Sequence, residues 1–485
     1  MAGKLQSAKV RVAFSPSLHQ YLHEPLAPIF LKTKGKPHIC CPKTNPRGNK
    51  FKVTGMIRKS FSLLALFIGL TLPWKSSGQA SSPFSSFGLG ELNGSGLVHN
   101  QGMGGAGVSM PKALFLNNIN PAMLVYSPLT VFNGGILLDS RKMSTGTQSE
   151  KVTGGNVASL ALACPVMYNR GKTRIRWASS IGLNPYSTVN YRIRSTLPVP
   201  GNPTSNYIQE EKAEGGFNQI YWSNGVFLGK GLSVGLKTAY MFSSVIGEFT
   251  NQLDLDNQLY RYQISMKEII SVSGMRFTPA FHYRIDSVAG NNFLNIGATF
   301  DMGKKIGGEL FQTIVRRDLS GTALQTDSIK LNNSSTYLPS VITGGISFGK
   351  AEKWTIAVDY AATKFTGSNA FIGVDAFPVT TGTRLSAGAE FIPDARSLTS
   401  LLKRMSYRTG VSMEKSPYLV NGAPLKDVGI NFGFSLPVNR VSSLDFAVRA
   451  GKRGDKNLNG LTENYFKVYF CVTFNDQWFI KSRFD

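Results

Sequence analysis

Apolar and polar residues alternate one by one through most of the chain from residue 129 onward. In "DVGINFGFSL" (427–436) every second side chain is apolar, and the side chains between them are polar or glycine. The same pattern recurs in four further stretches, 354–360, 384–391, 444–450 and 466–474. Because successive side chains of a strand point to opposite faces, this period predicts β-strands with one apolar and one polar face.

The lengths of the strands and connections favour a membrane barrel over a soluble β-sandwich. The expected strands are about 10 residues long, as a tilted membrane strand requires. Short connections are expected at 286–292, 349–353 and 437–442, and long polar loops at 193–213, 316–336, 364–382, 413–426 and 451–463. Short turns opposite long external loops are typical of outer-membrane barrels. We predict an all-β, transmembrane antiparallel β-barrel of about fourteen to sixteen strands within residues 129–485.

A secretory signal peptide is predicted inside the chain rather than at its start. Residues 56–80 have the three parts of a signal peptide. Arg58 and Lys59 form a basic start, residues 61–72 an apolar core, and Gly78-Gln79-Ala80 a small-x-small cleavage site. That core is too short to cross a bilayer as a helix, which needs about 20 residues. Cleavage is therefore expected between Ala80 and Ser81, followed by export to the bacterial outer membrane.

The segment before this signal, residues 1–55, shows neither helical nor strand periodicity. It carries ten Lys and Arg residues against one acid, Glu24. A signal peptide acts from the extreme N-terminus, so we expect translation to begin at Met56 and the first 55 residues to be a misassigned start. The alternative is a basic, disordered extension. Neither interpretation gives these residues a folded role.

Composition excludes several classes of function. Of the net charge of +25, residues 1–55 carry +9. After the signal peptide a net charge of +13 remains and is scattered rather than clustered, and an exported chain has no nucleic acid to bind. After the signal peptide only His99 and His282 remain as histidines, without zinc-ligand spacing, so no metal, no cofactor and no enzymatic activity are expected. The alternation places Cys164 and Cys471 on opposite faces of the wall, so both are expected to be free.

Four stretches resemble the FadL family, outer-membrane transporters of long-chain fatty acids and other hydrophobic molecules. These stretches are 101–124, which ends in Asn120-Pro121-Ala122, and 335–365, 383–417 and 428–451. The resemblance implies a 14-stranded barrel whose N-terminal segment folds into the lumen as a hatch. It also implies passive uptake of hydrophobic molecules such as fatty acids, with lateral release into the bilayer lipid.

Residues 81–128 suit the hatch independently of the resemblance. They precede the first strand, are rich in Gly and Ser, and show no strand alternation. The lumen of fourteen strands is too wide for wall side chains alone to fill. The alternative is a periplasmic tail outside the barrel. Asn120-Pro121-Ala122 either helps to seat the hatch or is simply a turn, which Asn and Pro both favour.

Alternation places several charged side chains on the lumen face: Arg384, Arg408, Arg449, Asp359, Glu390, Asp427 and Asp445. Each of the three arginines is a candidate partner for the carboxylate of a fatty acid. With four acids on the same face, we favour a ladder of mutually paired charges that braces the wall.

A break in the wall is predicted at Asn184-Pro185, in the third strand. Proline has no N–H for the neighbouring strand, and a closed barrel has no edge at which to place it. In the FadL family the third strand carries an inward kink that opens the wall laterally, so Asn184 and Pro185 resemble such a gate. The alternative is that the strand ends there and Pro185 begins an external loop.

Two functions follow from these features. The first is transport of hydrophobic molecules, which an apolar pocket between hatch and wall would support. The second is a FadL-like barrel acting as a structural or docking subunit of an outer-membrane secretion or assembly complex. A filled, polar lumen would support this second function, and the loop at 365–382 carries enough apolar residues to be compatible with it.

Overall fold

The computed structural model describes residues 80–477, apart from 95, 147, 168–174, 200–201, 255–262, 289, 319 and 368–377. The predicted N-terminal extension 1–55 lies outside the described residues, as does the signal peptide 56–80 except for Ala80. The centre of the loop predicted at 365–382 also lies outside them.

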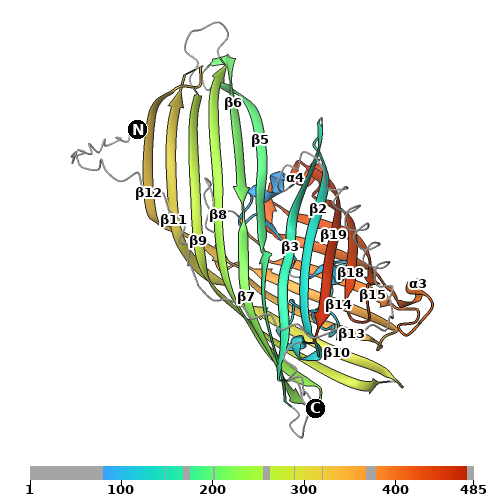
Figure 1. The fold of residues 1–485 in the computed structure, drawn as a ribbon. Helices are drawn as coiled ribbons and strands as arrows, with labels where there is room; N and C mark the ends of the chain where they lie inside the picture. The colour runs from blue at the N-terminus through green and yellow to red at the C-terminus, as the bar shows by residue number, and fades with distance from the viewer. Residues whose placement is uncertain are drawn as a thin grey trace, which may run out of the picture. The chain divides into compact units, whose positions relative to one another are not determined.

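Fourteen antiparallel strands pair in a closed ring within the described residues (Figure 1). Each strand pairs with the next one in the ring, and β19 closes the ring by pairing with β2. The ring strands are β2 (Thr130–Ser144), β3 (Ser149–Met167), β4 (Arg176–Pro185), β7 (Phe217–Gly229), β8 (Leu232–Asp254), β9 (Gln263–Val288), β10 (Asn292–Asp301), β13 (Ser340–Lys350), β14 (Trp354–Lys364), β15 (Gly382–Phe391), β16 (Ser406–Val420), β17 (Ala423–Pro437), β18 (Ser443–Arg453) and β19 (Thr462–Asp476). The predicted all-β barrel of about 14 strands is confirmed.

The two faces of the wall follow the alternation in the sequence. On β17, Val428, Ile430 and Phe432 are about half exposed on the outside, whereas Asp427 and Asn431 are buried inside. An apolar outer face and a polar inner face are what a barrel surrounded by lipid requires. The two cysteines of the described residues, Cys164 and Cys471, are free, with Cys471 fully buried and Cys164 half-buried.

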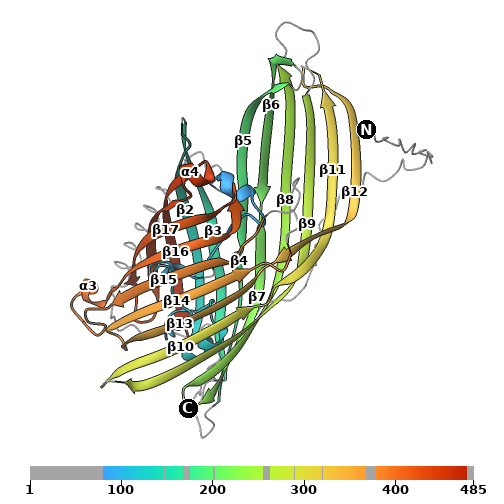
Figure 2. The same cartoon turned by 180° about the vertical axis from the view of Figure 1, so that it is seen from behind.

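Two of the predicted external loops are strands instead. Residues 193–213 lie in β5 (Ser187–Val199) and β6 (Asn202–Gly215), and residues 316–336 lie largely in β11 (Lys304–Arg317) and β12 (Ala323–Leu338). These four strands flank the distal halves of β8 and β9, which run beyond the ring. The result is a six-stranded extension in the order β5-β6-β8-β9-β11-β12, whose strands stand side by side in Figures 1 and 2.

The alternation in the extension is inverted relative to the ring, which explains the error. Beyond residue 243 the outer side chains of β8 become polar, as at Ser244 and Glu248, while Val245 is buried on the inner side. Val245 packs with Ile270 and Val272 of β9 in one apolar cluster. A third predicted loop, 413–426, is also strand. There β16 and β17 meet in a two-residue turn at Asn421 and Gly422, whose φ angles of 53° and 75° fit a type I′ hairpin.

The N-terminal segment, residues 80–127, packs against inner side chains of the ring. It contains η1 (Pro83–Ser86), β1 (Glu91–Leu92), α2 (Val98–Gln101) and η2 (Pro121–Tyr126). A Cβ at Gly388 or at Gly410 would overlap the backbone at Met103, so these wall glycines permit the close approach of the segment. The remaining helices are α3 (Leu401–Arg404) and α4 (Lys456–Asn459), and none of the described helices is long and apolar enough to cross a membrane.

The ring has two ends, which we call the proximal and the distal rim. The ring begins at Thr130 and ends at Asp476 on the proximal rim, and the six-stranded extension rises from the distal rim. The N-terminal segment runs from the distal rim, where Ser82 contacts Glu463 at the start of β19, to the proximal rim, where η2 precedes β2. Longer connections face the outside in outer-membrane barrels, so the distal rim corresponds to the cell surface.

Candidate functional site

The ladder between β3 and β4 is shorter than either of its neighbouring ladders. It runs from Met167–Trp177 to Leu160–Leu183 and ends there. β3 continues to Ser149 while paired only with β2, and after Pro185 the chain leaves to form β5, which pairs with β6. The distal half of β3 therefore has no partner strand on its β4 side among the described residues. This leaves an opening in the wall, which we call the wall opening.

Pro185 lies at the point where the ladder ends. The Tyr186 N–H donates to the Phe217 carbonyl on β7, at 2.7 Å. Because backbone groups of a strand alternate between its two neighbours, the nitrogen of Pro185 faces the β3 side, where proline has no hydrogen to give. The neighbouring Asn184 is buried, and its amide oxygen accepts from Gln219 Nε2 at 3.2 Å.

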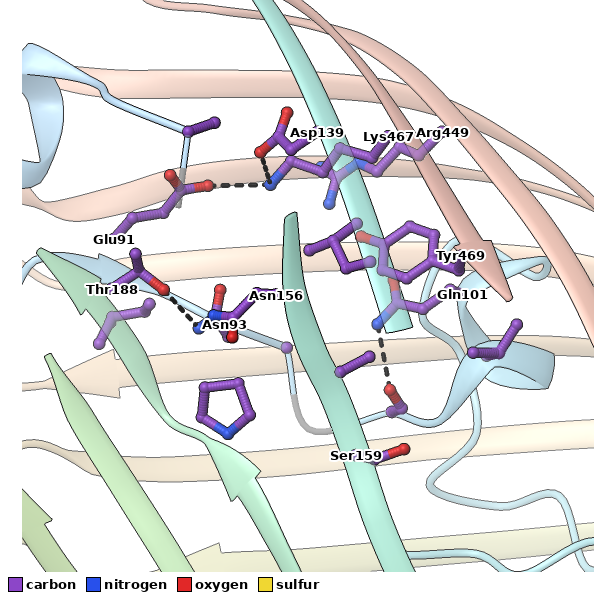
Figure 3. Close-up of a pocket in the computed structure, with 18 of the residues that line it drawn as sticks. Glu91, Asn93, Gln101, Asp139, Asn156, Ser159, Thr188, Arg449, Lys467 and Tyr469 are labelled. Atoms are coloured by element: carbon purple, nitrogen blue, oxygen red, sulfur yellow. Dashed lines mark hydrogen bonds and ion pairs between the residues drawn. The ribbon is translucent and has the colours of Figure 1, made fainter. Parts of the chain in front are cut away.

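A cavity that is open to solvent lies behind the wall opening, between the N-terminal segment and the wall (Figure 3). Residues 154–159 of β3 line one side of it, and Pro185 and Thr188 line the other. β1 pairs with the first residues of β5, and Asn93 Nδ2 donates to Thr188 Oγ1 at 3.1 Å. The N-terminal segment thus sits directly behind the opening and is hydrogen-bonded to one of its edges.

Charged side chains dominate the distal part of this cavity and the wall beside it. Four carboxylates and four cations form what we call the rim cluster: Glu91, Asp139, Asp427, Glu463, Arg141, Arg449, Arg453 and Lys467. Such buried charges are tolerated only when paired, and removal of one partner typically costs about 3–5 kcal/mol.

Glu91 links the N-terminal segment to this cluster. Its carboxylate lies 2.6 Å from Arg141 Nη1, 2.9 Å from Arg453 Nη2 and 3.0 Å from Lys467 Nζ. Burial by itself would raise the pKa of Glu91, but the three cations outweigh that effect and hold the pKa well below its usual range. The carboxylate is therefore ionised at neutral pH and acts as an anchor between segment and wall.

A second anchor is Asp359 on β14. Its Oδ2 accepts from the backbone N–H groups of Gly107, at 2.6 Å, and Val108, at 2.8 Å. Hydrogen bonds to a charged acceptor contribute about 1.5–3 kcal/mol each. The sequence analysis placed Asp359 in the lumen but missed this role. It also missed Glu91, although Glu91 is the only acid in residues 80–127 and that isolation was a usable signal.

The three predicted arginines occupy different environments. Arg408 Nε lies 2.7 Å from Glu390 Oε2, and Glu390 also pairs with Lys112 of the N-terminal segment. Arg449 Nη2 lies 2.9 Å from Asp427 Oδ1. Arg384 makes no ion pair within the described part of the chain.

Arg384 borders two adjoining cavities. It lines the cavity behind the wall opening and a second cavity beside it. Its Nη2 donates only to the Gly104 carbonyl, at 3.3 Å, among its described contacts. Of the three arginines, Arg384 therefore has the guanidinium most available to a ligand.

Asn120-Pro121-Ala122 lies at the junction between the N-terminal segment and the first ring strand. Asn120 is fully buried and caps η2, since its Oδ1 accepts from the Ala122 N–H at 3.0 Å. Its Nδ2 donates to the Val108 carbonyl at 2.8 Å and to the Phe281 carbonyl on β9 at 3.0 Å. The junction is thus hydrogen-bonded both to the segment and to the wall.

None of the described residues form a group of three or more His, Cys, Asp or Glu side chains placed to hold a metal ion. Histidine chemistry is also restricted. Burial, and then the nearby Arg408, lower the pKa of His99 to about 3, so this ring is neutral at physiological pH.

Three solved structures with the same fold are a hydrocarbon channel and two toluene transporters. The CymD monoaromatic hydrocarbon channel matches with a TM-score of 0.51 and 16% identity, over 81% of this chain and 99% of that chain. The Pseudomonas putida toluene transporter TodX matches with a TM-score of 0.52 and 14% identity, over 82% and 100%. The Ralstonia pickettii toluene transporter TbuX matches with a TM-score of 0.50 and 14% identity, over 81% and 99%. No curated protein sequence matches this chain.

The closed ring, the apolar outer face and the interior N-terminal segment define an outer-membrane β-barrel with the fold of FadL-like transporters, as the sequence resemblance predicted. Within that class, the BamG family model matches residues 56–485. The chain therefore belongs to the BamG family.

Proposed function

We propose that this protein carries hydrophobic molecules, such as long-chain fatty acids, passively across the outer membrane and releases them sideways into the bilayer. In this proposal residues 81–128 act as the hatch and Asn120-Pro121-Ala122 seats it. Residues 56–80 are removed on export. Asn184 and Pro185 frame the exit, and the carboxylate of a fatty acid pairs with Arg384.

The observation that carries the proposal is the wall opening. An unpaired backbone group that faces hydrocarbon costs several kcal/mol, so an interrupted ladder in a membrane wall needs a reason. Here the ladder stops beside a proline, and a cavity lies directly behind the gap. Passage of cargo between the cavity and the bilayer explains both features.

The test compares Pro185→Val with Pro279→Val. Valine at position 185 supplies the missing N–H, so the β3–β4 ladder can extend and uptake of a fluorescent long-chain fatty acid should fall several-fold. Pro279 lies on β9, paired with Leu236 and away from the opening, so its valine variant controls for loss of a wall proline. Unchanged uptake in a correctly assembled Pro185→Val barrel would reject the exit.

Arg384→Gln separates the cargo from the route. Loss of the guanidinium should raise the KM for a fatty acid while leaving uptake of an uncharged hydrocarbon unaffected, because only the acid has a carboxylate to pair. Equal losses for both molecules would mean that Arg384 supports the wall rather than the cargo.

A second candidate function is a structural or docking subunit of an outer-membrane secretion or assembly complex. The observation that favours it is the lining of the cavity, where Glu91, Arg384 and Lys467 stand in place of a continuous apolar surface. The six-stranded extension also offers partners a large surface beyond the ring.

Its test is native electrophoresis of outer membranes dissolved in mild detergent, combined with a photo-crosslinking residue at position 329 of the extension. A docking subunit should migrate in a defined assembly, crosslink to one partner, and function normally with Pro185→Val. A monomer without crosslinks would exclude this role.

A further inference from the structure

Glu463, at the distal end of β19, is a fully buried carboxylate with an incomplete set of partners. Its Oε1 accepts from the hydroxyl of Ser82. Its Oε2 has no hydrogen-bond donor among the described residues. The nearest cations to Oε2 are Arg141 Nη1, at 3.7 Å, and Arg453 Nη1, at 4.0 Å.

Both arginines are already engaged with other acids. Arg141 lies 2.6 Å from Glu91 and 2.5 Å from Asp139. Arg453 lies 2.9 Å from Glu91 and 2.8 Å from Asp427. A buried carboxylate oxygen without a donor is costly, and both arginines lie closer to other acids than to Glu463. Glu463 is therefore placed to accept from one more cationic donor.

The predicted processing site lies next to this carboxylate. Ser82 follows the Ala80–Ser81 bond directly and is almost fully buried, with its N–H donating to the Asn190 carbonyl at 2.8 Å. Hydrolysis of the Ala80–Ser81 bond by signal peptidase consumes one water. It leaves a carboxylate on Ala80 and an ammonium group on Ser81. One residue spans about 3.6 Å, so the new ammonium stays beside the partners of Ser82.

We propose that Glu463 is the binding site for the α-ammonium group of Ser81. The ligand is a primary ammonium that exists only after the signal peptide is removed. In the precursor, the nitrogen of Ser81 is a neutral amide that is still bonded to Ala80, so this ion pair cannot form. Processing would thus fix the start of the N-terminal segment at the distal rim. The inference rests on the predicted cleavage site and is independent of any transport.

The test is amine labelling of the full-length mature protein purified from outer membranes. Mass spectrometry first identifies the N-terminal residue. Reductive methylation then compares the α-amine of the native and the denatured protein. We expect labelling of native Ser81 to be at least ten-fold slower than in the denatured chain. Glu463→Gln should remove most of this protection.

The matched control is Glu309→Gln, since Glu309 is an exposed carboxylate on β11 that pairs with Lys330 at 2.9 Å. This variant should label like the wild type. If Glu463→Gln fails to assemble, a serine inserted directly after Ser81 decides the question. It keeps the cleavage motif but moves the ammonium one residue further from Ser82, and it should raise the labelling rate.

Three results would overturn the proposal. One is a mature chain that begins elsewhere than Ser81. Another is an α-amine that reacts equally fast in the native and denatured wild type. The third is protection that survives both Glu463→Gln and the serine insertion, because the amine would then be shielded by burial alone.

Discussion

Asp359 offers the sharpest test of how the N-terminal segment is held. The carboxylate sits on a ring strand, yet it accepts hydrogen bonds from two successive backbone N–H groups of the segment, those of Gly107 and Val108. Asp359→Ala removes both bonds and leaves two buried donors without a partner. Asp359→Asn keeps an acceptor oxygen but removes the charge.

The magnitude follows from the two bonds. A hydrogen bond to a charged acceptor contributes about 1.5–3 kcal/mol, so the loss of both amounts to at least about 3 kcal/mol for Asp359→Ala. Since about 1.4 kcal/mol corresponds to a factor of ten, the equilibrium for local release of the segment should rise roughly 100-fold. Asp359→Asn should give an intermediate effect, because its oxygen still accepts without the charge.

Hydrogen exchange measured by mass spectrometry reads this equilibrium directly, in peptides that cover residues 98–112 of the detergent-solubilised barrel. The matched control is Asp445→Ala. Asp445 is also a buried lumen carboxylate, but the described residues that donate to it, Ser435, Ser443 and Thr473, all belong to the wall. Exchange in 98–112 should stay unchanged in this control.

Two results would refute the reasoning. If Asp359→Ala exchanged at the wild-type rate in 98–112, the segment would be held by other contacts. If Asp445→Ala accelerated exchange as much as Asp359→Ala, the effect would come from a weakened barrel rather than from a lost anchor.

Three further predictions concern the same interior. Gly410→Ala should destabilise the protein by about 1–3 kcal/mol, because the added Cβ overlaps the backbone of the seated segment at Met103. Gly344→Ala, which has open space around its added Cβ, should change the stability by less than about 0.5 kcal/mol. Calorimetry of both variants checks these values. The pKa of Glu91 is lower in the folded than in the unfolded protein, so the stabilisation by its ion pairs is complete above the unfolded pKa and is lost only as the pH falls through the folded pKa. The protection of the β1 amides from hydrogen exchange should therefore be the same at pH 7 and pH 5, once the rates are corrected for intrinsic exchange. Non-reducing peptide maps should show Cys164 and Cys471 unlinked.

The sequence predicted the ring well because lipid imposes a strict rule on it. Outward side chains at membrane depth are predominantly apolar, so strands such as β17 carry an unbroken period of two. The same rule correctly gave the inward positions of Arg408, Asp427 and Arg449. The count also held, since the closed ring has the fourteen strands that the resemblance implied.

The extension escaped prediction because lipid no longer constrains it. On the distal half of β8 the polar side chains face outward and Val245 faces inward. The rule that holds for the ring, apolar side chains outward and polar ones inward, therefore assigns these residues to the wrong faces. Charged residues such as Arg192 and Glu210, which pair across β5 and β6, then resemble a polar loop. The anchors were equally hidden, because a contact between Glu91 and Lys467 joins residues that no local pattern relates.

The distribution of anchors limits how the interior can open. Hydrogen bonds tie the segment to several strands of the wall. Asp359 on β14 accepts from the Gly107 N–H, and Asn431 on β17 donates to the Gln101 carbonyl. Release of the whole segment would break all of these hydrogen bonds together. Its free-energy cost would approach the total unfolding free energy of a typical domain, about 5–15 kcal/mol. A smaller motion is available beside the wall opening, at the glycine-rich residues 88–94. They meet β5 through the two residue pairs of β1 and through two side-chain hydrogen bonds, from Ser187 to the Leu89 carbonyl and from Asn93 to Thr188. If cargo passes through the wall opening, residues 88–94 must move and the ion pairs of Glu91 must break, while the remainder of the segment stays in place. A docking subunit, in contrast, needs no such motion. Mobility confined to residues 88–94 would therefore favour transport over docking.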